Sequence, residues 1–168
     1  MARTISFQDK KLTLLGRELS VGDTLPSFKV VGNDMSDITE SFLTGKTAIV
    51  ATVPSVDTPV CSIELKRFNK ELEALSGNVI LLAVSMDLPF AQKRWCGAEG
   101  VTKVTTASDF KYRSVGEGFG THIQEWGLLS RALFVTSAQG KLTYVEYVPE
   151  VAQEPNYEAA LKAVKAAL

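Results

Sequence analysis

Two runs of β-branched and apolar residues constrain the fold most strongly. Thr47–Val53 and Val79–Val84 are each bounded by turn residues, which is typical of strands buried on both faces of a sheet. The apolar residues between the runs recur at spacings of three and four, which predicts a helix; they are Leu65, Phe68, Leu72 and Leu75. Strand, helix and strand form a βαβ unit, so we expect the two strands to be parallel and the crossover right-handed.

The remaining pattern predicts more strands and helices around this unit. Alternating residues on either side of Gln8-Asp9-Lys10 indicate an N-terminal β-hairpin. Further strands are expected at Phe28–Val31, Val101–Thr105, Leu133–Thr136 and Leu142–Val148, the last two as an antiparallel hairpin. Helices are expected at Pro89–Cys96, Phe110–Val115 and Tyr157–Leu168. This order predicts an α/β fold in one domain, residues 1–168, with a mixed central sheet flanked by helices in a thioredoxin-like layout.

Charge and hydropathy limit the partners and the compartment. The chain carries 18 Lys and Arg against 19 Asp and Glu, a formal net charge of −1. Nucleic acid or a membrane surface, held by bulk electrostatics, is therefore not an expected partner. The N-terminus lacks the apolar run of a signal peptide, and the longest apolar run, Val79–Val84, is far shorter than the roughly 20 residues that span a bilayer. We expect a cytoplasmic protein.

The most informative segment is the one that ends at Cys61. Thr58 is a good N-cap and Pro59 fits the first helical position, which places Cys61 in the first turn of the helix. Unpaired backbone N–H groups and the helix dipole stabilise a thiolate there, and such sites lower a thiol pKa from about 8.5 to between ~3.5 and ~7.5. The alternative is an inert cysteine, because Cys61 also continues the apolar stripe of Leu65 and Phe68.

The second cysteine, Cys96, follows 35 residues later at the end of a predicted short helix, before Gly97. This spacing excludes a CxxC dithiol but allows a Cys61–Cys96 disulfide; taken alone, Cys96 is better interpreted as an unpaired, partly buried thiol. Two cysteines and the single histidine, His122, cannot supply the four ligands of a structural zinc. We expect no metal and no other cofactor.

The other candidate residues give weaker signals. Arg131 directly precedes an apolar strand, where a surface arginine is the default interpretation and a thiolate partner the less frequent one. Gly116–Gly120 lacks the features of a phosphate loop and is expected to be a flexible turn. His122 is expected in a loop, and Asp57 with the Lys93-Arg94 pair in solvent.

Three classes of function remain open at this point. A thiol redox enzyme would use Cys61, and a cysteine hydrolase would need His122 as its base. A non-catalytic binding domain would keep both cysteines in its core. The residues alone favour the redox enzyme.

Several segments resemble the peroxiredoxins. Pro54, Thr58 and Cys61 have the spacing of the peroxidatic motif of that family. The segments 54–61, 87–100 and 127–132, together with the N-terminal hairpin and the tail from Glu154, are similar to its thiol peroxidase branch, the atypical two-cysteine type. The resemblance covers essentially the whole chain and shows no departure at a functional position.

The resemblance implies a role for each of these residues. Cys61 would be the peroxidatic cysteine that reduces hydrogen peroxide and organic hydroperoxides, and Cys96 the resolving cysteine that forms a disulfide with it. Thr58 and Arg131 would orient and polarise the peroxide, and Pro54 would shield the pocket. The resemblance also implies thioredoxin as the reductant, a homodimer, and a role in antioxidant defence.

A disulfide requires Cα atoms about 4.4–6.8 Å apart. Cys61 begins one predicted helix and Cys96 ends another, so we expect the pair not to meet this distance in the reduced fold. The first turn of the Cys61 helix, the Cys96 segment, or both would then unwind in each cycle.

Overall fold

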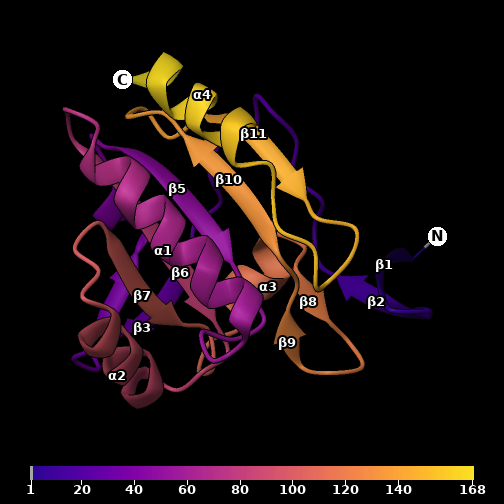
Figure 1. Ribbon diagram of the computed structural model, residues 1–168. Helices are drawn as coiled ribbons and strands as arrows, with labels where there is room; N and C mark the ends of the chain where they lie inside the picture. Colours follow the sequence, from indigo (N-terminus) through magenta and orange to yellow (C-terminus); the bar gives the residue numbers. More distant parts are fainter. Residues whose placement is uncertain (1) are drawn as a thin grey trace.

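The computed structural model describes residues 2–168, which form a seven-stranded sheet with the order β11-β10-β5-β6-β7-β3-β4 beside a smaller four-stranded sheet (Figure 1). The strands β5, β6 and β7 are parallel, and the other neighbours in the large sheet are antiparallel. The strands of the large sheet are β3 (Lys29–Gly32), β4 (Asp37–Thr39), β5 (Thr47–Thr52), β6 (Val79–Ser85), β7 (Val104–Ser108), β10 (Ala132–Thr136) and β11 (Leu142–Tyr147). The predicted mixed sheet is confirmed.

The predicted βαβ unit consists of β5, the helix α1 (Pro59–Glu73) and β6. Thr47 lies opposite Val79 and Thr52 opposite Val84 in the parallel register. Every residue of β5 is buried, because other elements cover both faces of the sheet. This explains why the strand is continuously apolar from Ala48 to Ala51 instead of alternating. The carboxyl ends of β5 and β6 meet at one edge of the sheet, so the loops that follow these two strands are neighbours.

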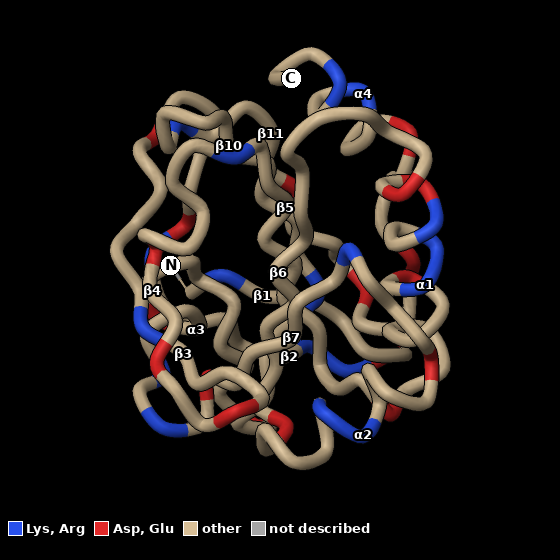
Figure 2. The backbone as a smooth tube through the Cα atoms, turned by 90° about the vertical axis from the view of Figure 1, so that its left-hand side faces the viewer, with Lys and Arg blue, Asp and Glu red and all other residues tan. Residues whose placement is uncertain are grey.

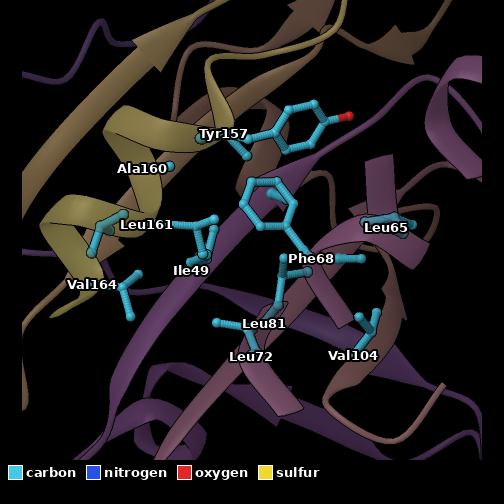
Figure 3. Close-up of a cluster of buried hydrophobic side chains, with 14 of the residues drawn as sticks. Ile49, Leu65, Phe68, Leu72, Leu81, Val104, Tyr157, Ala160, Leu161 and Val164 are labelled. Carbon is cyan, nitrogen blue, oxygen red and sulfur yellow. The ribbon is translucent and has the colours of Figure 1, made fainter. Parts of the chain in front are cut away.

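Helices cover one face of the large sheet: α1, α2 (Pro89–Glu99) and α4 (Tyr157–Ala167) (Figure 1). In the core between them and the sheet, the ring of Phe68 on α1 lies 5.1 Å from that of Tyr157 on α4, with Ile49 of β5 nearby (Figure 3). The predicted C-terminal helix is confirmed. Its apolar side is held against the sheet by this cluster.

The opposite face is covered by α3 (Ser114–Gly118), the short 3-10 helix η1 (Glu40–Leu43) and the segments next to them. Phe119 is the centre of this second core. Its ring packs edge-on against Phe28 at 5.9 Å and against Phe134 of β10 at 5.1 Å. The large sheet is therefore buried on both faces.

The predicted N-terminal hairpin is also confirmed. It consists of β1 (Arg3–Phe7) and β2 (Lys10–Leu15) and continues into β8 (His122–Ile123) and β9 (Leu128–Leu129) to form the four-stranded sheet. A bridge from Ser6 to Glu150 joins the hairpin to the segment after β11. The hairpin thereby brings Phe7 to the candidate site described below.

Two predicted elements lie further along the chain than expected, and side-chain hydrogen bonds to the backbone explain both shifts. The strand predicted at residues 101–105 begins later, at Val104, and is β7. The Asn69 side chain accepts the backbone N–H groups of Thr102 and Lys103 and holds these two residues in a turn before the strand. The helix predicted at residues 110–115 begins later, at Ser114, and is α3. The Asp109 carboxylate accepts the backbone N–H groups of Val115 and Gly116 and thereby fixes the first turn of the helix at this position. Residues 116–118 are therefore helical, and the prediction of a flexible turn there was wrong.

The helix that carries Cys96 is longer than predicted. It passes through Gly97 and ends at Glu99, where Gly100 adopts the left-handed conformation with a φ of 63°. The Gly100 N–H donates to the carbonyl of Cys96 and closes the last turn. Gly100, and not Gly97, ends the helix because only the former has the positive φ that favours glycine.

Charged residues of both signs are interspersed over the molecule instead of gathering by sign (Figure 2). This distribution agrees with the near-zero net charge of the chain. Within residues 2–168, no helix combines the length and apolar character needed to cross a membrane.

Replacing Phe68 by alanine should lower the free energy of unfolding by about 3–5 kcal/mol, because the ring is fully buried between α1, α4 and the sheet. Denaturant unfolding measures this loss. Ile63→Ala is the matched control on the same helix, since that side chain is 51% exposed and should change the free energy by well under 1 kcal/mol. Equal losses in the two variants would contradict the assigned core.

Candidate functional site

Cys61 lies in the first turn of α1, directly after the loop that leaves β5. As predicted, Thr58 is the N-cap and Pro59 the first helical residue. The Thr58 hydroxyl accepts the backbone N–H of Cys61 at 3.4 Å and donates to the carbonyl of Ser55 at 3.0 Å. The cap therefore connects the loop to the turn that carries the thiol.

Asp87, which follows β6, fixes this loop from the neighbouring strand. Its carboxylate accepts the Ser55 hydroxyl at 2.7 Å, the Val56 N–H at 2.9 Å and the Ser85 hydroxyl at 2.6 Å. Asp87 was not among the predicted site residues. The available signal was a carboxylate just after a buried parallel strand, at the sheet edge where such folds place their sites.

Arg131 contacts the thiol directly. Its Nη1 donates to Cys61 Sγ at 3.3 Å, and both side chains are almost completely buried. The default interpretation of Arg131 as a surface residue was therefore wrong. The reason is the β5–β10 register: Ala132 pairs with Thr52, so the preceding residue, Arg131, lies beside the point where β5 runs into the loop before Cys61.

Arg131 has two further partners inside the protein. Nη1 also donates to Glu64 Oε2 at 3.2 Å, and Nη2 donates to the carbonyl of Val151 at 3.0 Å. Val151 follows β11, so this hydrogen bond joins Arg131 to a third part of the chain. The guanidinium is held in one orientation, with one nitrogen directed at sulfur.

Glu64 is fully buried, and its second carboxylate oxygen has no hydrogen-bond partner in the described chain. Burial raises the pKa of Glu64 to about 8, although the charge and hydrogen bond of Arg131 act in the opposite direction. Near neutral pH the carboxyl group is then largely protonated, and it does not cancel the charge that Arg131 directs at Cys61.

Sequence reasoning missed Glu64 as part of the site. The signal was present, because Glu64 follows Cys61 by three residues and therefore shares the buried stripe of α1. A carboxylate in that stripe indicates a buried cationic partner, but the sequence does not show which cation approaches it.

An apolar pocket of about 200 Å³ opens beside these groups. Pro54, Thr58 and Arg131 line it, so the structure brings three predicted site residues together next to Cys61. Its other walls are almost entirely apolar and come from distant parts of the chain: Phe7, Pro59, Val60, Val151 and Ala152. A small molecule with a polar end and an apolar body fits this lining.

Cys96 does not line this pocket. It lies in the last turns of α2, half-buried, with Sγ 3.2 Å from the hydroxyl oxygen of Thr106 on β7. It faces a different cavity, of about 560 Å³, lined mainly by β7 and by the segment from Gly32 to Phe42. Both cysteines are free thiols in this structure, and α2 holds Cys96 against β7.

Contacts beside the two cysteines connect their helices. Trp95 Nε1 donates to the hydroxyl of Ser62 at 3.2 Å, which joins the residue before Cys96 to the residue after Cys61. Arg94 and Asp57 form an ion pair at 3.3 Å, and both are more than half exposed, as predicted. The first turn of α1 and the end of α2 are therefore docked on each other.

His122 lies in β8 and is buried, so the prediction of a loop residue was wrong. Its Nδ1 has no hydrogen-bond partner in the part of the chain that the structure describes. The contacts of Cys61 are with Thr58 and Arg131, and none supports the Cys–His pair of a hydrolase. Among residues 2–168 there is also no cluster of three His, Cys, Asp or Glu side chains that could hold a metal ion.

Comparison with known proteins agrees with this geometry. Residues 20–161 match the model of the Redoxin family. A crystal structure of a peroxiredoxin-like protein from Aquifex aeolicus is 42% identical, superposes with a TM-score of 0.90, and the match covers 100% of this chain and 99% of that one. The chain therefore belongs to the redoxin family and has its thioredoxin-like fold.

The relatives also place the chain within that family. It is 47% identical to the thiol peroxidase of Halalkalibacterium halodurans, over 98% of this chain and 99% of the relative. It is 45% identical to the thiol peroxidase of Bacillus subtilis, over 96% of each. The predicted resemblance to thiol peroxidases, which are peroxiredoxin-type oxidoreductases, is confirmed.

Glu64→Gln should change how stability depends on pH. Because the folded protein keeps the Glu64 proton up to about pH 8 while the unfolded chain releases it near 4.5, stability is lost as pH rises through this window. Relative to the wild type, the free energy of unfolding of Glu64→Gln should therefore rise by about 1 kcal/mol or more between pH 5 and 8.

Denaturant unfolding at several pH values measures the difference. Glu71→Gln, a partly exposed position on the same helix, is the control and should differ from the wild type by a constant amount. If the free energy of unfolding of Glu64→Gln also differed from that of the wild type by the same amount at every pH, Glu64 would be ionised throughout the window.

Proposed function

We propose that this protein is a thioredoxin-dependent thiol peroxidase that reduces hydrogen peroxide and organic hydroperoxides to water and alcohols, with Cys61 as the reacting group. The observation that carries the proposal is the buried Cys61 Sγ at a helix N-terminus, 3.3 Å from the guanidinium of Arg131 and beside an open pocket. Positive charge and N–H groups at that position favour a thiolate, which is the form that attacks peroxides.

In the first step the Cys61 thiolate attacks one peroxide oxygen and the O–O bond breaks. The sulfur becomes a sulfenic acid, and the second oxygen leaves with a proton as water or an alcohol. Arg131 and Thr58 line the pocket, where they would orient the peroxide and stabilise the charge on the departing oxygen. Pro54, buried at the pocket wall, would shield the sulfenic acid from water.

In the second step the Cys96 thiol condenses with the sulfenic acid. The S–S bond forms, the S–O bond breaks, and the hydroxyl leaves with the Cys96 proton as water. Thioredoxin then reduces the disulfide, which requires a disulfide potential near or above about −270 mV. Neither step requires a metal or another cofactor.

The pocket supports organic hydroperoxides as well as hydrogen peroxide. Its walls beyond Thr58 and Arg131 are apolar, and they continue from Pro54 to Phe7 of the N-terminal hairpin. An alkyl group would bury apolar surface there, whereas hydrogen peroxide would use only the polar end.

The remaining parts of the proposal concern assembly and location. We propose a homodimer of single-domain chains (residues 1–168) that acts in the cytoplasm in antioxidant defence. Exposed apolar side chains near the site, such as Ile63, Leu88 and Phe90, are suited to contact with a second protein chain.

Rapid mixing of the reduced protein with one equivalent of an organic hydroperoxide at pH 7 tests the proposed activity. We expect peroxide to be consumed orders of magnitude faster than by free cysteine, with loss of both thiols and a change in Trp95 fluorescence. Cys61→Ser should abolish the reaction. Cys96→Ser should keep one fast turnover that ends in a sulfenic acid, and a wild-type rate equal to that of free cysteine would contradict the proposal.

Arg131→Ala should lower the fraction of Cys61 that is thiolate at pH 7 and slow peroxide reduction at least tenfold, because the buried cation at 3.3 Å is lost. Thiolate absorbance in a Cys96→Ser background measures the first effect. Arg94→Ala removes an exposed arginine and is the control. An unchanged thiolate titration in Arg131→Ala would exclude Arg131 from the mechanism.

A further inference from the structure

The resting position of Cys96 is built from side chains that the proposed chemistry does not use. Thr106, which is buried on β7, lies 3.2 Å from Cys96 Sγ through its hydroxyl oxygen. The same hydroxyl donates to Asn33 Oδ1 at 2.9 Å, and Asn33 directly follows β3. Three elements, α2, β7 and the loop after β3, thus meet at this thiol.

The number of protons fixes the direction of these hydrogen bonds. A threonine hydroxyl has one hydrogen, and Thr106 donates it to Asn33. Its oxygen can then only accept, so the hydrogen in the contact with Cys96 is the S–H hydrogen of the cysteine. This arrangement stabilises the protonated thiol, in contrast to Cys61, where Arg131 donates to the sulfur.

The position of Cys96 also keeps it away from its reaction partner. The cavity beside Cys96 is lined by residues of β3, β4, β7 and η1, and it shares no lining residue with the pocket beside Cys61. The buried Trp95, docked on Ser62, lies next to Cys96 on α2. Cys96 therefore has to leave Thr106 before it can reach Cys61.

We propose that Thr106 and Asn33 are positioning residues that hold the Cys96 thiol in its resting place, and that release from this pair controls the disulfide step. The inference rests on the proposed function. In that step Cys96–SH and Cys61–SOH give the disulfide and one water, and the hydrogen that Thr106 holds leaves with the hydroxyl of the sulfenic acid. The hydrogen bond from Cys96 to Thr106 stabilises the reduced state. It is absent from the disulfide, whose sulfur atoms have no hydrogen to donate.

Thr106→Val tests this role, since it keeps the shape of the side chain and removes the hydroxyl. In rapid mixing with a hydroperoxide, the first phase should be unchanged and the second phase about fivefold faster, the size of one lost hydrogen bond. The disulfide potential should become more negative by about 20 mV, the equivalent of fivefold for a two-electron couple. An unchanged or slower second phase would overturn the proposal.

Two variants separate the hydroxyl from general packing. Thr106→Ser keeps the hydroxyl and loses a methyl group, so its second phase should match the wild type even if its stability falls. Thr105→Val makes the same change as Thr106→Val at the neighbouring position, which lines the same cavity but has no hydrogen bond to Cys96, and should leave both phases unchanged. A faster second phase in Thr106→Val, Thr106→Ser and Thr105→Val alike would indicate loosened packing and overturn the proposal.

Asn33→Asp tests the direction of the hydrogen bonds. An ionised carboxylate can only accept, so Thr106 must still donate to it and the thiol stays held; the second phase should be slower than in the wild type. A faster second phase would mean that the amide donates to Thr106 and Thr106 to the sulfur, which would contradict the proposed holding of the thiol.

A second readout does not depend on peroxide chemistry. In reduced Cys61→Ser protein, iodoacetamide should alkylate Cys96 about fivefold faster when Thr106→Val is added. If Thr106→Val speeds the alkylation but the wild type does not react rapidly with peroxide, the proposed function fails, whereas the role of Thr106 and Asn33 in holding Cys96 stands. If the wild type reacts rapidly with peroxide but Thr106→Val changes neither the alkylation nor the second phase, only the proposed role of Thr106 and Asn33 fails.

Discussion

The buried charge of Arg131 is the constraint on which the rest of the site depends. A buried guanidinium is costly unless it is paired or hydrogen-bonded. The protein surrounds it with the Val151 carbonyl, the Glu64 carboxyl and the Cys61 sulfur. Because burial raises the pKa of Glu64 to about 8, the carboxyl group is a weak counter-charge near neutral pH. The Cys61 sulfur is the third group that the Arg131 guanidinium contacts, through Nη1 at 3.3 Å.

This arrangement explains several features of the fold that are remote from the sulfur. The antiparallel register of β5 and β10 sets the position of Arg131, and the segment after β11 supplies the carbonyl that orients it. The N-terminal hairpin is joined to the same segment by a bridge from Ser6 to Glu150, and it carries Phe7 to the pocket. The second sheet thus supplies one wall of the pocket beside the buried charge.

The sequence predicted what local physics determines. Runs of apolar residues predicted β5 and β6, and apolar residues spaced by three and four positions predicted α1 and α4. The N-cap and first-turn residues predicted that Cys61 lies in the first turn of α1. The errors occur where side-chain hydrogen bonds decide the outcome: the distant Asn69 displaces the start of β7, and the nearby Asp109 displaces α3. Arg131 and Glu64 resemble the case of Asn69, because 67 residues separate them and no local pattern shows that β10 will place one beside the other.

The two cysteines differ in the direction of their hydrogen bonds, and this difference fits their proposed order of reaction. Arg131 donates to the Cys61 sulfur in the first turn of α1, as expected for the cysteine that is proposed to attack first. The Thr106 hydroxyl beside Cys96 accepts from the thiol, as expected for the cysteine that is proposed to react second. A second reactive thiolate at Cys96 would compete with Cys61 for peroxide. Holding Cys96 on Thr106, beside a cavity that shares no lining residue with the pocket next to Cys61, is consistent with this order of the two steps.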